Sequence, residues 1–296
     1  MKRHTGLVSI ITLNMNQTDV TVEFLLSLKK SKYKNFEVVV VDQNSKKDPT
    51  QALKNAFPNV IVVLNKINNG FTGGNNLAVE YTKGEFIFCV NNDTIITENL
   101  IGNLIEPLND PTIGIVSPKI KYFFNQDIIQ YAGYTQTSRY TGRNYTFGKG
   151  ETDNGQHDSP KIVAYAHGCA MMIPYKIIEK IGFLDDQYFI YYEELDFSER
   201  VNAAGYKVYY NPTAEIYHKE SMTTGKNSTF KEYYHTKNRI LFMRKYSKKW
   251  FQIFSYGIYF ILLIIPKKIV QYVPRMKFLH LKEFFRGIFW NLKNKV

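Results

Sequence analysis

The sequence predicts an α/β protein built on a mostly parallel sheet, followed by a basic helical tail. Three observations lead to this prediction. Apolar strand-like runs alternate with helix-like runs at the spacing of βαβ units. Within each strand-like run, apolar residues follow one another without polar residues between them, as expected for a sheet covered on both faces. Several runs end in polar clusters, at the edge of the sheet where ligands bind in such folds.

The first 118 residues carry the clearest alternation. A helix is expected to start at Asp48-Pro49, because Asp is a good cap and Pro is tolerated at the first helical position. A loop rich in Gly and Asn precedes another expected helix. We expect strands at 7–13, 37–41, 60–64, 86–90 and 113–117, and helices at 19–30, from 48, from about 74 to 82 and at about 98–108.

Residues 120–160 are polar and show no clear periodicity, so we interpret them as an insertion or a mobile loop. Regular structure is expected again at 162–166. A helix should open at Pro174 and end near Gly182, and a second should be closed by Gly205. We therefore expect later strands at 162–166, 207–210 and 214–217, and helices at 174–182, 193–204 and from 227 or 228 to 246.

A chain of 296 residues can bury a substantial core. Its two cysteines, Cys89 and Cys169, lie in apolar runs and are predicted to be buried, reduced thiols. The N-terminal Met-Lys-Arg-His leads into a short apolar strand rather than a secretory signal. We therefore expect a cytoplasmic location.

The net charge of +12 is concentrated at the C-terminus. Residues 231–296 hold 15 Lys and Arg but only two acids, and the first 230 residues are nearly neutral. Such asymmetry indicates an anionic partner, either a membrane surface or nucleic acid. No basic stripe accompanies the polar strand ends, so we expect no nucleic-acid binding.

Two segments of the tail are predicted to be helices at a membrane surface. Trp250–Ile265 has 16 uncharged residues, is flanked by lysine pairs and should end at Pro266. It falls short of the roughly 20 residues that a span needs. Leu279–Leu292 is amphipathic and aromatic, which favours the interface of an anionic membrane. A packed helical subdomain, a homodimer interface and a short tilted span of the membrane are the alternatives.

Asn91-Asn92-Asp93 directly follows the apolar run 86–90. Mg²⁺ and Mn²⁺ are often held by one or two carboxylates together with substrate phosphates, so Asp93 could bind such an ion. The alternative is that this cluster caps the next helix. His218, at the end of a predicted strand, becomes a plausible metal ligand if it lies beside Asp93. Otherwise it is an ordinary surface or core histidine.

Three further stretches could carry chemistry. Asp42 ends the apolar run "VVVV" and could read a base or ribose, or form a turn. Residues 68–76 place three glycines where exposed amides could receive phosphate, although the pattern is neither a Walker loop nor GxGxxG. Glu193 and Glu194 suit the start of a helix, but either could also serve as a general base.

Taken together, in the order in which they occur along the chain, these motifs resemble those of the family 2 glycosyltransferases. They are most similar to the branch that builds bacterial cell-wall polysaccharide, which includes rhamnosyl- and galactofuranosyltransferases. The resemblance covers about residues 6–240. It depends on the full ordered set rather than on any one motif. The set is "VSIITLNMN", "VVVVDQNS", "NNGFTGGNN", "FCVNNDT", "HGCAMMIPYKIIEKIGFLDDQYFIYYEELDFSERVNAAGYKVYYNP" and "YHKES".

The resemblance implies the A-type glycosyltransferase fold, with a nucleotide-binding half at about 1–118, an acceptor half at 119–240 and the tail at 241–296. Asp42 matches the acid that reads the nucleotide base. Asp93 and His218 match the metal ligands. Glu193-Glu194 matches the pair that supplies the catalytic base, and Glu194 is our first choice.

Two positions depart from the family pattern. Asn91 replaces the first acid of the metal motif, which leaves one carboxylate fewer, and a Glu stands at the second position of the catalytic pair. The resemblance also implies wider contact sets. On the donor side these are Thr12, Asn14, Asp42, Asn44, Asn69, Gly70, Gly74, Asn75, Asn91 and Asn92, and on the acceptor side His167, Gly168, Asp185 and Tyr192.

The implied activity is inverting transfer of a sugar from a nucleoside-diphosphate donor, with Mg²⁺ or Mn²⁺ as cofactor. The donor is expected to be dTDP-rhamnose, with UDP-hexoses or UDP-galactofuranose as alternatives. A polyprenyl-linked glycan on the inner face of the plasma membrane is the expected acceptor. A nucleotidyltransferase would want an Arg or Lys signature near the first strand, which "LVSIITLNMN" lacks. The acids Asp93, Glu193 and Glu194 argue against a catalytically silent scaffold.

Overall fold

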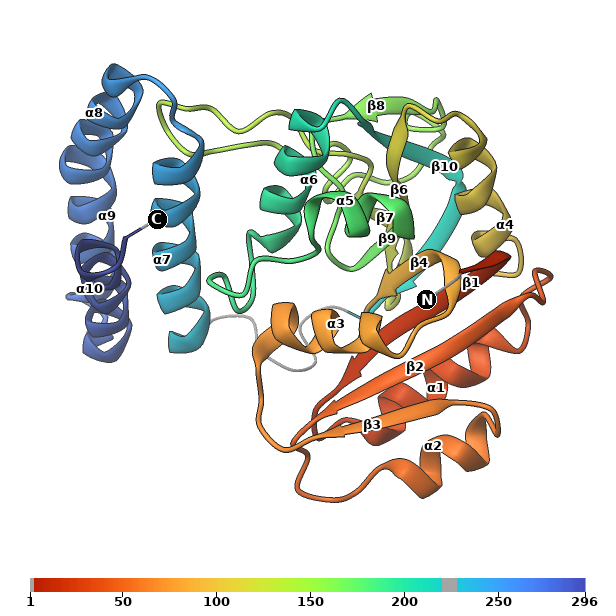
Figure 1. Cartoon of the computed structure of the whole chain (residues 1–296). Helices are drawn as coiled ribbons and strands as arrows, with labels where there is room; N and C mark the ends of the chain where they lie inside the picture. The colour runs from red at the N-terminus through yellow and green to blue at the C-terminus, as the bar shows by residue number, and fades with distance from the viewer. Residues whose placement is uncertain (1–2, 220–227, 296) are drawn as a thin grey trace. The chain divides into compact units, whose positions relative to one another are not determined.

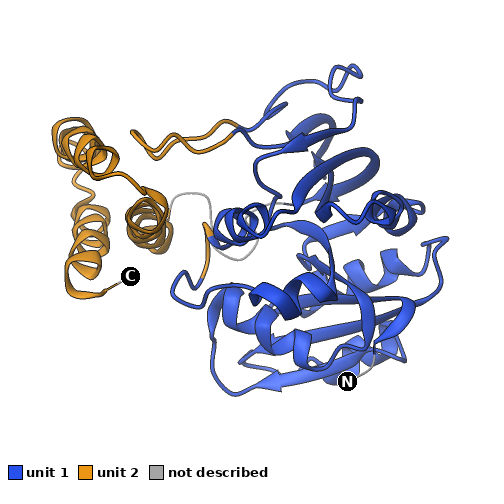
Figure 2. Ribbon diagram, turned by 45° about the horizontal axis from the view of Figure 1, so that its top comes forward, with its two compact units in different colours: residues 1–135, 146–189, 193–223 blue, residues 136–145, 190–192, 224–296 orange. Residues whose placement is uncertain are grey.

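A computed structural model describes residues 3–219 and 228–295, which form two compact units (Figure 2). Unit 1 comprises the described residues of 1–135, 146–189 and 193–223, and unit 2 those of 136–145, 190–192 and 224–296. The boundary predicted at residue 240 falls inside α7 (Thr229–Tyr246), which is one continuous helix and packs against α10 (Phe278–Lys293). Residues 220 and 221 of the motif "YHKES" and residue 227 lie outside the described residues.

Unit 1 is built on one mixed sheet of ten strands (Figure 1). The main path runs β3-β2-β1-β4-β9-β6-β10-β5, with β7 beside β6 and β8 beside β10. The pairs β1·β2, β1·β4, β2·β3 and β6·β10 are parallel, and the others are antiparallel. The strands are β1 (His4–Asn14), β2 (Phe36–Gln43), β3 (Ile61–Asn65), β4 (Gly84–Val90), β5 (Thr94–Ile96), β6 (Ile113–Tyr122), β7 (Asn125–Tyr131), β8 (Lys161–Val163), β9 (Ala170–Pro174) and β10 (Lys207–His218).

Helices alternate with these strands, as the sequence predicts. The run Val38–Val41 is fully buried, which explains why its strand lacks polar alternation. The glycine-rich loop is shorter than expected, because the next helix already begins at Gly70. The helices of unit 1 are α1 (Thr18–Leu28), α2 (Thr50–Ala56), α3 (Gly70–Glu80), α4 (Leu100–Ile105) with the 3-10 turn η1 (Glu106–Asn109), α5 (Tyr175–Ile181) and α6 (Glu193–Ala203).

Two predictions for the second half are wrong. The strands expected at 207–210 and 214–217 are one strand, β10, which continues through a register shift between Asn211 and Glu215. The stretch 120–160 is not wholly irregular, since it contains β7. Two register shifts in the pairing of β6 with β7 interrupt the alternation by which β7 could have been recognised.

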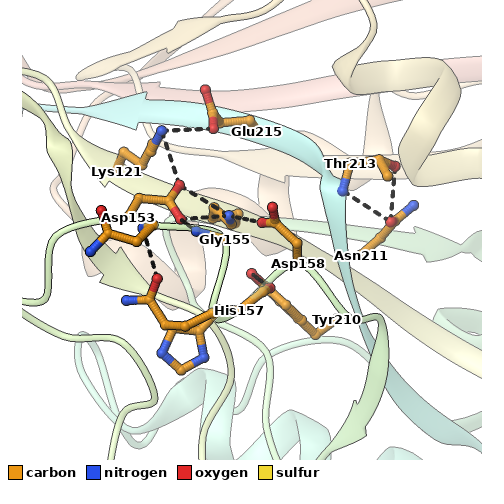
Figure 3. Close-up of polar contacts among 12 residues, drawn as sticks. Lys121, Asp153, Gly155, His157, Asp158, Tyr210, Asn211, Thr213 and Glu215 are labelled. Atoms are coloured by element: carbon orange, nitrogen blue, oxygen red, sulfur yellow. Dashed lines mark hydrogen bonds and ion pairs between the residues drawn. The ribbon is translucent and has the colours of Figure 1, made fainter.

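A buried ion-pair network fixes the segment around residues 153–158 onto β6 and β10 (Figure 3). Lys119 is 3% exposed and pairs with Asp153 and Asp158. Lys121 joins Asp153 to Glu215, with both Nζ–O distances at 3.1 Å. Burial raises the pKa of Asp153, but the two lysines outweigh it and hold this pKa below its ordinary value. Charge pairs therefore help to anchor the loop after β7.

Unit 2 contains a helix that the sequence predicted to stop at Pro266 but that continues past it. α8 (Trp250–Tyr259), a π-helical turn η2 (Phe260–Ile264) and α9 (Ile265–Tyr272) follow one another without a break. Proline lacks an N–H and its ring clashes with the carbonyl four residues earlier, so a widened turn just before it lets the helix proceed. Among the described residues, the 23-residue helix Trp250–Tyr272 is the one that is long and apolar enough to cross a membrane.

Candidate active site

Asp93 and His218 lie side by side, although 125 positions separate them in the chain. The buried strand β4 ends at Val90, and the chain turns into β5, which pairs antiparallel with the end of β10. In this register Thr94 faces His218. Oδ1 of Asp93 is 3.1 Å from Nε2 of His218, and each residue is 6% exposed.

Gln130 on β7 fixes the orientation of the His218 ring. Nδ1 of His218 donates a hydrogen bond of 2.8 Å to Oε1 of Gln130, so that Nε2 points toward Asp93. Burial alone would lower the pKa of His218, but Cys169 and Asp93 outweigh it and hold this pKa well above its ordinary value. The sequence did not single out Gln130, because it lies in the stretch without periodicity.

Asp93 and His218 are suited to bind a divalent cation whose remaining ligands come from a substrate. Oδ1 of Asp93 is buried and lies against Nε2 of His218, so an oxygen and a nitrogen that can both ligate a metal face each other. Histidine ligands to metals commonly donate their other ring N–H to an oxygen, as His218 does to Gln130. No group of three or more His, Cys, Asp and Glu side chains suited to a metal occurs in the described part of the chain. An ion here would therefore complete its coordination with phosphate oxygens and water, as Mg²⁺ commonly does.

Glu193 and Glu194 begin α6 next to the loop that precedes β9. A Cβ atom built on Gly168 would lie 3.6 Å from Oε1 of Glu193 and 3.6 Å from Cβ of Glu194, so the backbone of Gly168 abuts both residues. The neighbouring His167 ring is 6.5 Å from the ring of His218, centroid to centroid. The carboxylate pair and the Asp93–His218 pair thus both lie near residues 167 and 168 of unit 1.

The two glutamates differ in their surroundings. Glu193 is 4% exposed, and burial together with Glu194 raises its pKa well above the ordinary value for Glu. Glu194 is half-buried, and its charge raises the pKa of Tyr134, which burial already raises. Glu194 is the less buried of the two residues, although its Oε2 is buried as well, and a base must touch the substrate.

Replacing Glu193 with Gln should stabilise the protein by about 1–3 kcal/mol, because burial and the charge of Glu194 both penalise the carboxylate, and a neutral amide avoids both costs. The gain should grow with pH. The pKa of Glu193 is higher in the folded chain than in the unfolded chain. Between these two pKa values the folded chain binds more protons than the unfolded chain does, so the free energy of unfolding of the wild type falls as the pH rises. Urea unfolding of both proteins from pH 4 to pH 8 measures this difference. An equal pH dependence in the two proteins would contradict it.

Residues predicted for the donor side, at the ends of β1, β2 and β4, form a continuous hydrogen-bond network through Thr21. Asn92 Nδ2 donates to Thr21 Oγ1 at 2.8 Å, and Thr21 Oγ1 donates to Asn14 Oδ1 at 2.8 Å. Asn14 Nδ2 in turn donates to Asp42 Oδ1 at 2.7 Å. Asp42 also accepts from the backbone N–H of Ser45. Asn14 and Asn92 therefore orient Asp42, and Thr21 and Ser45 join the site without having been predicted for it.

The glycines of α3 are required by close contacts. Gly70 has φ +74°, and a Cβ there would lie 2.5 Å from the carbonyl oxygen of Phe189. A Cβ on Gly74 would lie 1.9 Å from Nε2 of Gln43. Gln43 donates to the carbonyl of Gly70 at 2.7 Å and accepts from the backbone N–H of Asn69 at 3.3 Å. Gln43 thus holds the first turn of α3 against β2, a role that the sequence did not indicate.

Other predicted residues have contacts or positions of their own. Asn75 is buried and donates to the carbonyl of Phe71, so its side chain is engaged within the fold. Asp185 accepts from the backbone N–H of Gln187. Tyr192 belongs to unit 2. Thr12 is buried on β1, Asn44 follows β2 with φ +60°, and Asn91 donates its backbone N–H to Cys169. Their contacts with substrates stay predictions.

Residues 9–182, more than half of the chain, match the family model for glycosyl transferase family 2. The chain belongs to this family. This family 2 chain is 26% identical over 213 residues to the low-salt glycan biosynthesis hexosyltransferase Agl10 of Haloferax volcanii, which covers 69% of this chain and 66% of the relative. It is also 26% identical over 94 residues to an N-acetylglucosaminyl-diphospho-decaprenol L-rhamnosyltransferase of Mycobacterium tuberculosis, covering 32% of this chain and 31% of the relative.

The first relatives are longer than the matched region, since the match spans 26% to 66% of their own length. Among solved structures, the family 2 chain is similar to the mannosyltransferase PcManGT from Pyrobaculum calidifontis in complex with GDP-Man and Mn²⁺. The TM-score is 0.61, the identity is 14%, and the match covers 98% of this chain and 88% of that chain. This likeness confirms the predicted A-type glycosyltransferase fold.

Proposed function

We propose that this family 2 chain is an inverting glycosyltransferase that moves a sugar from a nucleoside diphosphate to a lipid-linked or growing cell-surface polysaccharide. The observation that carries the proposal is the convergence of Asp93 and His218 with Glu194 around Gly168 and His167. A pair of side chains that can hold a divalent cation, and a carboxylate that can act as a base, are the parts that glycosyl transfer with inversion needs.

In the proposed reaction, Glu194 takes the proton of the acceptor hydroxyl while the oxygen attacks the anomeric carbon. The bond from that carbon to the diphosphate oxygen breaks, and the nucleoside diphosphate leaves with the electron pair. Asp93 and His218 would hold a divalent cation, which neutralises the charge that develops on the diphosphate. Asp42 would accept a hydrogen bond from the nucleotide base, since each carboxylate oxygen can accept more than one.

The donor we propose first is dTDP-rhamnose, because one relative is named as a rhamnosyltransferase. A UDP-sugar is the alternative, since another is named as a hexosyltransferase. A thermal-shift screen of nucleotide sugars with Mn²⁺ or Mg²⁺ tests both, because a ligand that binds the folded state raises its melting temperature. We expect dTDP-rhamnose with Mn²⁺ to give the largest increase, by several degrees. If no nucleotide sugar raises the melting temperature, the proposed function is wrong.

We further propose that unit 2 attaches the protein to the inner face of the plasma membrane through the helix Trp250–Tyr272. Many of its apolar side chains are exposed, including Phe254 at 61% and Leu262 at 65%. Lysines flank the helix on both sides, which suits an anionic surface. A decaprenol-linked substrate in the name of one relative also supports a lipid-linked acceptor.

Flotation with liposomes that contain phosphatidylglycerol should bring the wild type to the top of a gradient. The double variant Phe254→Ser, Leu262→Ser should stay at the bottom, because it loses apolar area that inserts into lipid. Leu64→Ser, an exposed apolar residue of unit 1, is the matched control and should float. Wild type that stays at the bottom would contradict membrane attachment. Extraction at alkaline pH separates an interfacial helix, which is released, from one that spans the bilayer.

A further inference from the structure

The stretch that leads into Glu193 has an unusual backbone. Phe189, Tyr191 and Tyr192 have φ values of +68°, +68° and +74°. This left-handed region is uncommon for residues other than glycine and is strained for bulky side chains. Such a conformation persists only where surrounding contacts hold it.

Asn238 of α7 supplies the most direct of these contacts. It is fully buried, and its Nδ2 donates two hydrogen bonds of 2.8 Å, to the carbonyl oxygens of Ile190 and Tyr191. Both carbonyls belong to the strained stretch. The two bonds use both N–H groups of the side-chain amide.

Neighbouring residues of α7 hold the same stretch. The ring of His235 stacks on that of Tyr191, with centroids 4.3 Å apart and planes at 12°. Nε of Arg239 donates to Oη of Tyr192 at 3.3 Å. One helical face thus grips residues 190–192 within unit 2, and the next residue along the chain is Glu193, the first of α6.

The other end of the stretch is tied to the donor loop within unit 1. The backbone N–H of Thr72, in the first turn of α3, donates to the carbonyl of Phe189 at 3.1 Å. The close approach of Gly70 to that same carbonyl leaves no room for a side chain at position 70. The stretch is therefore anchored at Phe189 by α3 and at residues 190–192 by α7. Glu193 and Glu194 follow directly after the anchor on α7.

We propose that Asn238 is a positioning residue for glycosyl transfer: by holding the carbonyls of Ile190 and Tyr191, it fixes the backbone that presents Glu194 to the acceptor. This inference rests on the proposed function. It assigns unit 2 a part in catalysis besides membrane attachment. A positioning residue should affect turnover rather than donor binding, because only the placement of the base changes.

The variant Asn238→Asp tests this, since it keeps the shape but replaces the donating amide with an accepting oxygen. Asn291→Asp is the matched control. Asn291 is also buried in unit 2, and its amide donates to the carbonyls of Lys237 and Gly287, so its variant loses the same kind of bonds away from residues 190–192. His235→Ala is a milder second variant, because this side chain is exposed and its loss should not prevent folding.

Two measurements are made on the full chain. Hydrogen exchange reports the amides of residues 189–194, and coupled release of nucleoside diphosphate from dTDP-rhamnose or UDP-sugar, with water in place of the acceptor, reports kcat and the donor KM. For Asn238→Asp we expect at least tenfold faster exchange and at least tenfold lower kcat, with the donor KM changed less than twofold. For His235→Ala we expect smaller changes in the same direction, and for Asn291→Asp neither.

Unchanged exchange at residues 189–194 in both α7 variants would overturn the inference, as would an equal loss of kcat in Asn291→Asp. If Asn238→Asp does not fold, His235→Ala decides by the same criteria. Failure of the proposed function looks different: Glu194→Gln would then keep wild-type release of nucleoside diphosphate, or no donor would be cleaved. The exchange measurement would still show whether Asn238 holds the stretch.

Discussion

Glu194→Gln is expected to lower the rate of sugar transfer by roughly 10²–10⁴-fold while leaving donor binding intact, because a general base contributes about that much to a reaction. The substitution keeps the size of the side chain and removes its ability to take a proton. Release of nucleoside diphosphate measures the rate, and calorimetric titration with the donor and Mn²⁺ measures the affinity.

Glu199→Gln is a suitable control for this experiment. Glu199 lies on the same helix, and its Oε1 accepts a hydrogen bond from Tyr165 that a Gln can also accept. This variant should keep wild-type turnover. Transfer that survives in Glu194→Gln but is lost in Glu193→Gln would move the role of base to the buried member of the pair.

Asp93→Ala should remove the dependence of donor affinity on a divalent cation. With Mn²⁺ present we expect a loss of roughly tenfold or more in affinity, since even outer-shell partners of metal ligands contribute 10–100-fold. With a chelator present, wild type and variant should bind the donor equally weakly. Titration calorimetry under both conditions gives the four affinities that the comparison needs.

Asp127→Ala controls for the loss of one negative charge. Asp127 is exposed on β7, the strand that also carries Gln130. Its variant should bind the donor and Mn²⁺ as the wild type does. A donor affinity that is the same for Asp93→Ala and wild type in Mn²⁺ would show that Asp93 does not hold the cation.

Much of the fold could be predicted because it depends on local patterns. Val38–Val41 reads as a strand buried on both faces, and it is fully buried. The helices ending near Gly182 and Gly205 also lie where the glycines predict. The predictions that failed involve tertiary contacts. β10 continues through a register shift because β6 pairs with it on both sides of the shift, and the helix before Pro266 continues because a widened turn accommodates the ring.

The candidate site divides in the same way. Asp42, Asp93 and Glu194 were identifiable because each is an acid at the edge of an apolar strand or at a helix start, within an ordered set of motifs. Thr21, Gln43 and Gln130 were not identifiable. Each is an ordinary polar residue whose role is to orient another side chain or a loop, and such a role depends on a partner distant in the sequence.

The amino-acid sequence alone determined the α/β class, the family and the acids on which the proposed chemistry depends, since alternating apolar runs and motif order are properties of neighbouring residues. The family resemblance paired Asp93 with His218, and the tertiary structure shows that they meet; only the tertiary structure decided that Gln130 orients the imidazole and that α7 holds the stretch before Glu193. The physical reason is that strand pairing and buried hydrogen bonds join residues about 50 to 125 positions apart, and nothing in the local sequence encodes which partners will meet.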